Sequence, residues 1–561
     1  MRKRAFMIAA SMFWLAAAAI PSAPIAGGEA KPVVQDDAIP ATGNKQYEPT
    51  WKSLAQHGTA PTWYEDAVFG IYFHWGVYSV AGKETRYMRH MYVPGHKVYE
   101  YHRKTYGDPK DFGYHDFIPM FKAEKWDPDR WAKLFKQSGA DFAGSIGEHH
   151  DGFSMWDTKY NKFNSMTMGP RRDVVGEMAR ALRKQGLKVV TTFHHLRWQW
   201  YDAGRSYCPK GVGVNNPNYF DLYGPPHEPA DEGRGLWLIG DQIKDPGAHV
   251  SDIIPKSYID NGYNKIIEVI DKYQPDHLQM DGGTCVRLGD ERLRRLLAYY
   301  FNAANGWGRE VAVSRGFDRN NPYVRSKTKG REVITSQVIP ITCSVQNIES
   351  HFPKVTLHEV NPDRWQTSSP IPGFAWAYVD TLEHKSPAEI TYGLNALIDG
   401  IVDVASKNGV TLLGVAPRAD GTFPESQMEI LNRLGDWMKV NKTALQGTDW
   451  HTTCEAGTLR FTRKGPYLYA INLEKPIAPA AIPDVTPEPG STIRMLGSDK
   501  NLPWHQEGSD LVIDELPDPL PCDHAWVFRI RPAGCPSRES HPAARAVSSW
   551  GCQCGDGDFR G

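Results

Sequence analysis

The sequence predicts an α/β protein in which a (β/α) barrel of the TIM type is followed by a C-terminal antiparallel β-sandwich domain. Short apolar runs alternate with amphipathic helical stretches over roughly 400 residues. Polar side chains stand at the ends of these runs, and a barrel gathers its strand ends at one face. No G-x-G-x-x-G follows any run, which weakens the alternative of an open, dinucleotide-binding sheet.

The individual elements follow from local signals. The predicted strands cover residues 68–73, 139–147, 187–193, 277–280, 310–314, 341–348 and 410–415, and the predicted helices cover 127–138, 170–186, 263–273, 290–302, 387–408 and 425–438. Asp127 caps a helix that has Pro128 at its first position, and Ser386 forms a capping box with Glu389. Residues 201–250 lack periodicity, so we expect them to form a lid or a substrate wall.

After Trp450 the pattern changes to short β-like runs such as TLRFTRKGPYLYAINL, which predicts a small antiparallel domain. We therefore expect a signal peptide at 1–26, a linker at 27–50, the catalytic barrel at 51–446, the β-sandwich at 447–533 and a disordered tail at 534–561.

The N-terminus is typical of an exported protein. Arg2, Lys3 and Arg4 precede an uncharged stretch that runs to Ile20, and small residues follow near Ala26. This stretch is too short for a transmembrane helix, and no cysteine lies near the cleavage region to carry a lipid anchor. We expect a periplasmic or extracellular protein without a membrane anchor. Export permits disulfides, but eight cysteines do not reveal their pairing.

The composition indicates which class of ligand the protein binds. The net charge of −1 argues against nucleic acid, because proteins that bind it carry a basic excess. The 18 tryptophans and 25 tyrosines suit the apolar faces of sugars, although a large core uses such rings equally well.

Titratable side chains gather at the predicted strand ends. They are His74, Glu148, His149, His150, His194, His195, Asp281, Arg315 and Glu349. Two carboxylates facing one pocket are what glycoside hydrolysis requires. The paired histidines also raise the alternative of a metal-dependent hydrolase, but the H-E-x-x-H spacing is absent and neighbouring residues at a strand end point in different directions.

Several stretches resemble glycoside hydrolase family 29, the α-L-fucosidases. They are FGIYFHWGVYS (69–79), EHHDGFSMWDTKYNKFNS (148–165), GPRRDVVGEMARALRKQGLKV (169–189), PDHLQMDGG (275–283) and DVASKNGVTLLGVAPRADGTFPE (403–425). The resemblance implies a TIM barrel with a C-terminal β-sandwich, and a retaining enzyme that releases terminal α-L-fucosyl residues from glycans without a cofactor or a metal.

The resemblance also implies a role for individual residues. Asp281 is the implied nucleophile, and Glu349 is the implied acid/base, with Glu359 as the reserve candidate. The implied fucose-binding side chains are His74, His149, His150, His194, Arg315, Trp376 and Glu84.

Three positions depart from the family pattern. Glu84-Thr85-Arg86 replaces Glu-Trp-Tyr, Gln279 replaces a tryptophan two positions before the nucleophile, and Trp365-Gln366-Thr367 replaces Trp-Glu-Thr. The third departure resembles the branch that prefers α-1,3/1,4-fucosides, whereas Ser368, Ser369 and Pro370 do not. The linkage preference and the oligomeric state stay open, and a non-catalytic fucose-binding barrel is the other alternative.

Overall fold

The computed structural model describes residues 46–196, 201–211, 213–225, 255–281, 284–316, 343–349, 352, 357 and 359–534. The predicted signal peptide, most of the predicted linker and nearly all of the predicted tail lie outside these residues. Among the described residues, no helix combines the length and the apolar character needed to cross a bilayer.

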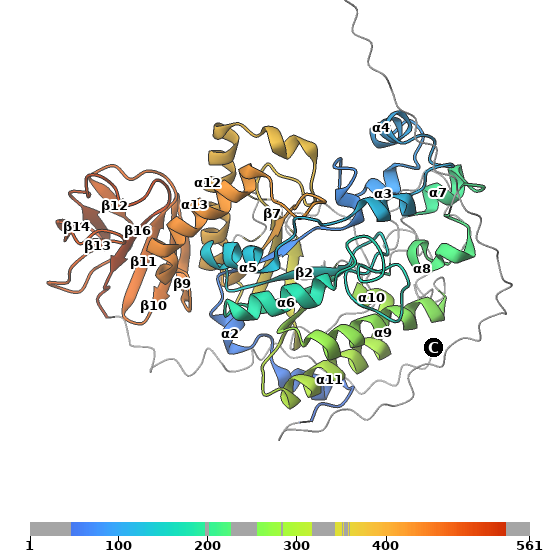
Figure 1. Cartoon of the computed structure of the whole chain (residues 1–561). Helices are drawn as coiled ribbons and strands as arrows, with labels where there is room; N and C mark the ends of the chain where they lie inside the picture. Colours follow the sequence, from blue (N-terminus) through green and yellow to red (C-terminus); the bar gives the residue numbers. More distant parts are fainter. Residues whose placement is uncertain are drawn as a thin grey trace, which may run out of the picture. The chain divides into compact units, whose positions relative to one another are not determined.

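Eight parallel strands form a closed barrel in the order of the sequence (Figure 1). They are β1 (Phe69–Phe73), β2 (Phe142–Glu148), β3 (Lys188–Phe193), β4 (His277–Met280), β5 (Ala312–Gly316), β6 (Val345–Glu349), β7 (Trp365–Pro370) and β8 (Gly409–Val415). The barrel closes where β8 pairs with β1, from Phe69 opposite Thr411 to Phe73 opposite Val415.

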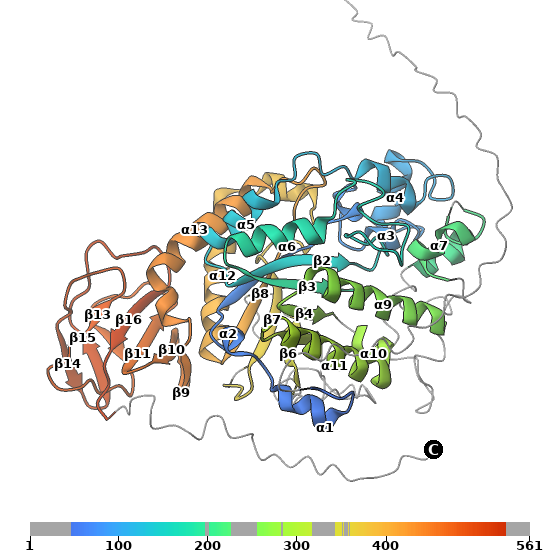
Figure 2. The same ribbon diagram turned by 60° about the horizontal axis from the view of Figure 1, so that its bottom comes forward.

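Six long helices belong to the barrel: α5 (Pro128–Gln137), α6 (Val174–Lys184), α9 (Lys256–Tyr273), α11 (Asp290–Gly306), α12 (Pro387–Ser406) and α13 (Glu425–Asn441). Figure 2 shows them surrounding the strands. The predicted caps are present: the Asp127 side chain accepts from the Arg130 N–H (3.1 Å), and Ser386 and Glu389 form the capping box.

Shorter helices fill the connections. The α-helices are α1 (Trp51–Leu54), α2 (Thr62–Glu65), α3 (Tyr87–His90), α4 (Lys97–Thr105), α7 (Asp202–Tyr207), α8 (Phe220–Tyr223) and α10 (Thr284–Leu288). The 3-10 turns are η1 (Ala55–His57), η2 (Val77–Ser79), η3 (Tyr114–Met120), η5 (Pro217–Tyr219), η8 (Asp380–His384) and η9 (Lys442–Ala444).

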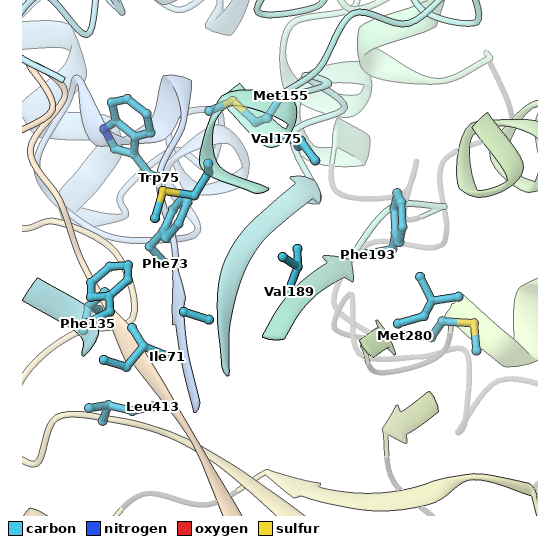
Figure 3. Close-up of a cluster of buried hydrophobic side chains, with 14 of the residues drawn as sticks. Ile71, Phe73, Trp75, Phe135, Met155, Val175, Val189, Phe193, Met280 and Leu413 are labelled. Atoms are coloured by element: carbon cyan, nitrogen blue, oxygen red, sulfur yellow. The ribbon is translucent and has the colours of Figure 1, made fainter. Parts of the chain in front are cut away.

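The largest apolar core lies between the strands and the helices. Figure 3 shows Ile71 of β1, Phe135 of α5 and Leu413 of β8 gathered on one side of this core, and all three are buried. The ring of Phe73 stacks edge-on against Trp131 of α5, with 5.0 Å between the centroids. Burial of such aromatic and aliphatic side chains holds the helices against the barrel.

The C-terminal region forms two antiparallel sheets, in the orders β13-β16-β11-β10-β9 and β12-β15-β14. The strands are β9 (Asp449–Ala456), β10 (Leu459–Lys464), β11 (Tyr467–Asn472), β12 (Ala480–Ile482), β13 (Arg494–Met495), β14 (Trp504–Glu507), β15 (Asp510–Ile513) and β16 (Trp526–Ile530). Residues of both sheets share one core, among them Phe461, Leu511 and Phe528. Together, the barrel and these packed sheets confirm the predicted fold class.

The structure differs from the sequence-based prediction in one whole strand, in several element boundaries and in the aperiodic region. Strand β7 was not predicted, because its sequence WQTSSP contains no apolar run. Helix α9 begins at Lys256, before the predicted residue 263. The aperiodic region contains α7 and α8 within its described part, and residues 226–254 lie outside the described residues.

Candidate active site

The barrel topology places most of the predicted site residues at one end. His74 follows β1, His149 and His150 follow β2, His194 follows β3, and Asp281 follows β4. Arg315 lies in β5, Glu349 is the last residue of β6, and Trp376 lies in the loop after β7. The strands are parallel and neighbouring, so their carboxyl ends meet at the same face of the barrel.

Four imidazole rings form a cluster at this face. The ring of His149 stacks on that of His194 with centroids 4.8 Å apart, and His150 lies 4.4 Å from His149. The His74 ring lies 5.4 Å from His149 and 5.5 Å from His194. All four are buried, so they are pre-positioned to hydrogen-bond a polar ligand such as a sugar hydroxyl.

Asp281 faces this cluster. Its Oδ2 lies 3.6 Å from His194 Nε2, and its side chain is 21% exposed, which leaves it within reach of a ligand. The backbone N–H of Asp281 donates to Phe193 O (2.9 Å), which holds the residue against the end of β3.

The His74 ring is held neutral. Burial lowers the pKa of His74 to about 3, although the negative charge of Asp281 opposes this shift. A neutral imidazole has one donor and one acceptor nitrogen, so it can match a hydroxyl in either direction.

Arg315 supplies the positive charge of the site. It is buried, it stands beside Met280 in the β4–β5 register, and its Nε donates to Ser344 Oγ (2.9 Å). Burial raises the pKa of Cys285 to about 12, against the opposing charge of Arg315. Burial likewise raises the pKa of Cys343 to about 11, so both thiols near the guanidinium stay protonated.

Trp376 contributes an apolar wall. Its ring lies 5.2 Å from His74 and 6.1 Å from Tyr72 between centroids. A Cβ on Gly414 of β8 would lie 2.8 Å from the Trp376 ring, so the indole packs against a strand position that only glycine leaves open. The flat ring suits the apolar face of a sugar.

A buried ion pair supports the turn that carries His149 and His150. Lys265 Nζ of α9 lies 2.8 and 3.0 Å from the two carboxylate oxygens of Glu148. The Ser154 hydroxyl donates to Glu148 Oε2 (2.5 Å), and the His194 N–H donates to Glu148 O (3.0 Å). The sequence predicts Glu148 at the end of a strand, but nothing in it identifies Lys265 as the partner of this carboxylate.

The two histidines of the pair after β3 have different surroundings. Whereas His194 turns toward Asp281, His195 Nε2 lies 3.1 Å from Gly262 O of α9 and takes part in packing. His150 Nδ1 lies 2.5 Å from His194 O. Ligand atoms of His74, His149 and His194 lie within 4.8 Å of one another, so this set could also hold a metal ion.

The two acid/base candidates and Glu84 lie at three different places relative to the histidine cluster. Glu349 ends β6 at the active face, but its side chain lies outside the description. Glu359 is exposed and lies between β6 and β7. The carboxylate of Glu84 contacts His90 Nδ1. Trp365, the first residue of the Trp-Gln-Thr departure, starts β7 and donates its indole N–H to Lys407 O (2.8 Å), away from the carboxyl ends of the strands.

Two of the unusual residues contact each other inside the barrel. The Gln366 amide donates to Gln279 Oε1 (3.0 Å) and to Asn347 Oδ1 (2.9 Å), and the Tyr64 hydroxyl donates to Gln366 Oε1 (2.6 Å). Gln279 of β4 and Gln366 of β7 thus satisfy each other's polar groups inside the barrel.

Sequence reasoning missed Tyr72 and Tyr78, whose rings lie 5.0 Å from His74 and 5.1 Å from His149. Both residues lie in the stretch 69–79 that carries the resemblance, but nothing in that stretch singled out either ring. Tyr72 lies in β1 and Tyr78 in η2, and the fold brings both rings against the histidines.

This constellation defines a class of protein. A TIM barrel with an accessible carboxylate, a cluster of buried imidazoles, an arginine and a tryptophan wall at the strand ends is the arrangement of a glycoside hydrolase.

Comparisons with known proteins give the family. The α-L-fucosidase family profile matches residues 36–443. A Thermotoga maritima α-fucosidase, solved in complex with a mechanism-based inhibitor, is 30% identical with a TM-score of 0.64, covering 87% of this chain and 100% of that chain. An α-L-fucosidase of Branchiostoma floridae is 25% identical over 87% of this chain and 96% of its own length. The human tissue α-L-fucosidase is 26% identical over 87% of this chain and 92% of its own length.

The chain belongs to the α-L-fucosidase family, glycoside hydrolase family 29. It is a glycosidase of the α-L-fucosidase type, as the resemblance of its motifs implied.

Proposed function

We propose that this enzyme releases terminal α-L-fucosyl residues from glycans or glycoconjugates by a retaining double displacement, with Asp281 as the nucleophile. The observation that carries the proposal is the accessible Asp281 carboxylate, 3.6 Å from His194 in a cluster of buried imidazoles. We place the catalytic domain at 51–446 and the β-sandwich at 447–533.

In the first step, Asp281 attacks the anomeric carbon and the glycosidic C–O bond breaks. Glu349 gives its proton to the departing oxygen. In the second step, water attacks the anomeric carbon, Glu349 takes the proton of that water, and the Asp281 carboxylate leaves. His74, His149, His150, His194 and Arg315 hold the sugar hydroxyls, Trp376 covers the apolar face, and Glu84 lines the rim.

The nucleophile is tested by Asp281→Ala with an aryl α-L-fucoside. We expect turnover to fall by several orders of magnitude, and added azide to restore it with a β-fucosyl azide product, because azide then attacks in place of the carboxylate. Unchanged turnover, or an inverted product from the unmodified enzyme, would contradict the proposal.

The acid/base is tested by comparing Glu349→Ala with Glu359→Ala on two aryl fucosides. A general acid contributes about 10²–10⁴-fold, and the contribution is largest for a poor leaving group. We expect Glu349→Ala to lose far more activity on the poor leaving group than on the good one, and azide to give a retained α-fucosyl product. If Glu359→Ala shows this pattern instead, Glu359 is the acid/base.

A metal-dependent hydrolase is the second candidate, because His74, His149 and His194 place possible ligand atoms within 4.8 Å of one another. Dialysis against EDTA separates the two functions. The two-carboxylate mechanism predicts that turnover persists after EDTA, whereas complete loss of activity that zinc restores would favour the metal mechanism.

We also propose that residues 1–26 direct export, so that the enzyme acts on glycans in the periplasm or outside the cell. The Arg2-Lys3-Arg4 start and the uncharged stretch after it support this. Mass spectrometry of the secreted protein should find an N-terminus near Gly27, and a cell-retained chain that keeps Met1 would contradict export.

A further inference from the structure

A second group of ligand-type side chains lies in one short segment, outside the histidine cluster at the strand ends. Glu84 precedes α3, His90 is the last residue of α3, and His96 is the N-cap of α4. The α-L-fucosidase mechanism described above gives His90 and His96 no task.

The three side chains converge. One possible ligand atom from each lies within 4.8 Å of the other two. The imidazole rings of His90 and His96 have centroids 4.2 Å apart, and Glu84 contacts His90 Nδ1. The side chains of His90 and Glu84 are 18% and 24% exposed, so the group is largely enclosed but reachable from solvent.

This donor set matches a transition-metal ion. Imidazole nitrogens and a carboxylate oxygen bind Zn²⁺ at about 2.0–2.2 Å in a tetrahedral arrangement, so two donors on one ion lie about 3.4 Å apart. The three donors lie within 4.8 Å of one another, so side-chain movements on the order of 1 Å bring them to that spacing. The hard ions Ca²⁺ and Mg²⁺ prefer oxygen ligands, so a set with two imidazoles does not favour them.

One existing hydrogen bond competes with the metal. His96 Nδ1 accepts from the Val98 N–H at the start of α4, at a length of 3.2 Å. Coordination through Nδ1 uses that lone pair, and coordination through Nε2 moves the ring proton onto Nδ1. The metal-bound form therefore loses this cap, which is a long hydrogen bond, and gains coordination bonds in its place.

We propose that Glu84, His90 and His96 form a binding site for a transition-metal ion, with Zn²⁺ as the best match. The site adjoins the sugar pocket through Thr85, whose Oγ1 accepts from the Ala377 N–H (3.2 Å). Ala377 follows Trp376 and pairs with His74. A bound ion thus braces the segment that supports the tryptophan wall.

The test uses the full chain after dialysis against a chelator, with Zn²⁺ added in a calorimetric titration and Co²⁺ absorption as a second measure. His96→Asn keeps an acceptor for the Val98 N–H, and His90→Gln keeps a donor for Glu84, so both variants preserve the local fold. We expect each to weaken one Zn²⁺ site by about tenfold or more. The Zn²⁺-induced rise in Tm should also be lost.

Two controls assign the site. His505→Ala removes a half-exposed histidine that pairs with Asp514 in the C-terminal sheets and should bind Zn²⁺ as the unmodified chain does. His149→Ala removes a ring of the other candidate cluster and should keep the site. The proposal is overturned if His90→Gln and His96→Asn bind Zn²⁺ as tightly as the unmodified chain, or if His149→Ala abolishes the binding attributed to them.

Discussion

Asp151 follows the histidine pair of β2 and is wholly enclosed. The Tyr114 hydroxyl donates to Asp151 Oδ2 (2.8 Å), and the Phe153 N–H donates to Oδ1 (3.2 Å). Burial nevertheless raises the pKa of Asp151 to about 7, because two donors do not replace the water that a carboxylate loses. The turn that carries His149 and His150 thus contains a carboxyl group that titrates near neutrality.

This pKa makes stability depend on pH with a defined sign. Between about pH 4 and pH 7 the folded chain holds a proton that the unfolded chain has released, so stability falls as pH rises through that window. We expect the unfolding free energy to lose on the order of 2 kcal/mol between pH 5 and pH 7 relative to Asp151→Asn. Denaturant unfolding of both proteins at pH 5, 6 and 7 measures this change in the unfolding free energy. Asp436→Asn, at an exposed ion pair, should leave the profile unchanged.

Gly414 controls the position of the tryptophan wall. The Cβ of Gly414→Ala would lie 2.8 Å from the Trp376 ring, and a rigid indole cannot move aside without leaving its place. We expect the KM for an aryl fucoside to rise at least several-fold. The added methyl should have little further effect in a Trp376→Ala background, and an additive loss in the double variant would show that the two residues act separately.

At the scale of elements, β7 shows why one strand escaped prediction. Its buried side chains Gln366 and Ser368 point into a polar layer of the barrel, where Ser368 Oγ donates to Asn347 Oδ1 (2.9 Å). A strand is normally recognised from its apolar face. Here the side chains that fill the barrel are polar, and only the neighbouring strands supply the partners that make their burial possible.

The Glu148–Lys265 pair joins β2 to α9, and both side chains are almost fully buried, at 2% and 6% exposed. Lys265→Met leaves Glu148 buried without its counter-charge, which typically costs about 3–5 kcal/mol. We expect this loss in thermal unfolding, together with a raised KM because the turn that carries His149 loosens. A double Glu148→Gln, Lys265→Met variant should regain part of the stability.

An exposed ion pair gives the matched control for that experiment. Lys184 and Asp129 are 65% and 57% exposed, so Lys184→Met should change stability by less than about 1 kcal/mol. Equal losses from Lys184→Met and Lys265→Met would contradict a special role for the buried pair.

At the scale of the whole molecule, charged groups join the barrel to the β-sandwich. Lys407 Nζ lies 2.8 Å from Asp403 Oδ1 and 2.9 Å from Glu455 Oε2 of β9. Arg460 Nε of β10 donates to Asp403 Oδ1 (2.6 Å). Nearby, the Trp437 indole N–H of α13 donates to His524 O (2.8 Å). These contacts couple the two parts through α12 and α13.

Arg460→Met tests this coupling. Removing a hydrogen bond between charged groups costs about 1.5–3 kcal/mol, and here the loss falls on contacts that span the two parts. We expect differential scanning calorimetry to show a lower Tm and a broadened or split transition. Arg494→Met in β13, whose Nε donates to Asn501 within the β-sandwich (3.0 Å), should retain a single transition.

The sequence by itself determined the fold class, the helix caps at Asp127 and Ser386, and the identity of the chemical groups. Caps such as Asp127 and apolar runs such as residues 410–415 depend on a few neighbouring residues, so the sequence alone predicts them. The HHDGF and QMDGG stretches also carried the family resemblance, which the α-L-fucosidase family profile over residues 36–443 confirms.

The tertiary structure decided everything that depends on contacts between distant segments. It separated His194, which faces Asp281, from His195, which packs on α9, and it supplied Lys265 for Glu148 and Gln366 for Gln279. These pairings join residues far apart in the chain, and their energies depend on burial and on the direction of each side chain. Neither quantity exists until the barrel has closed.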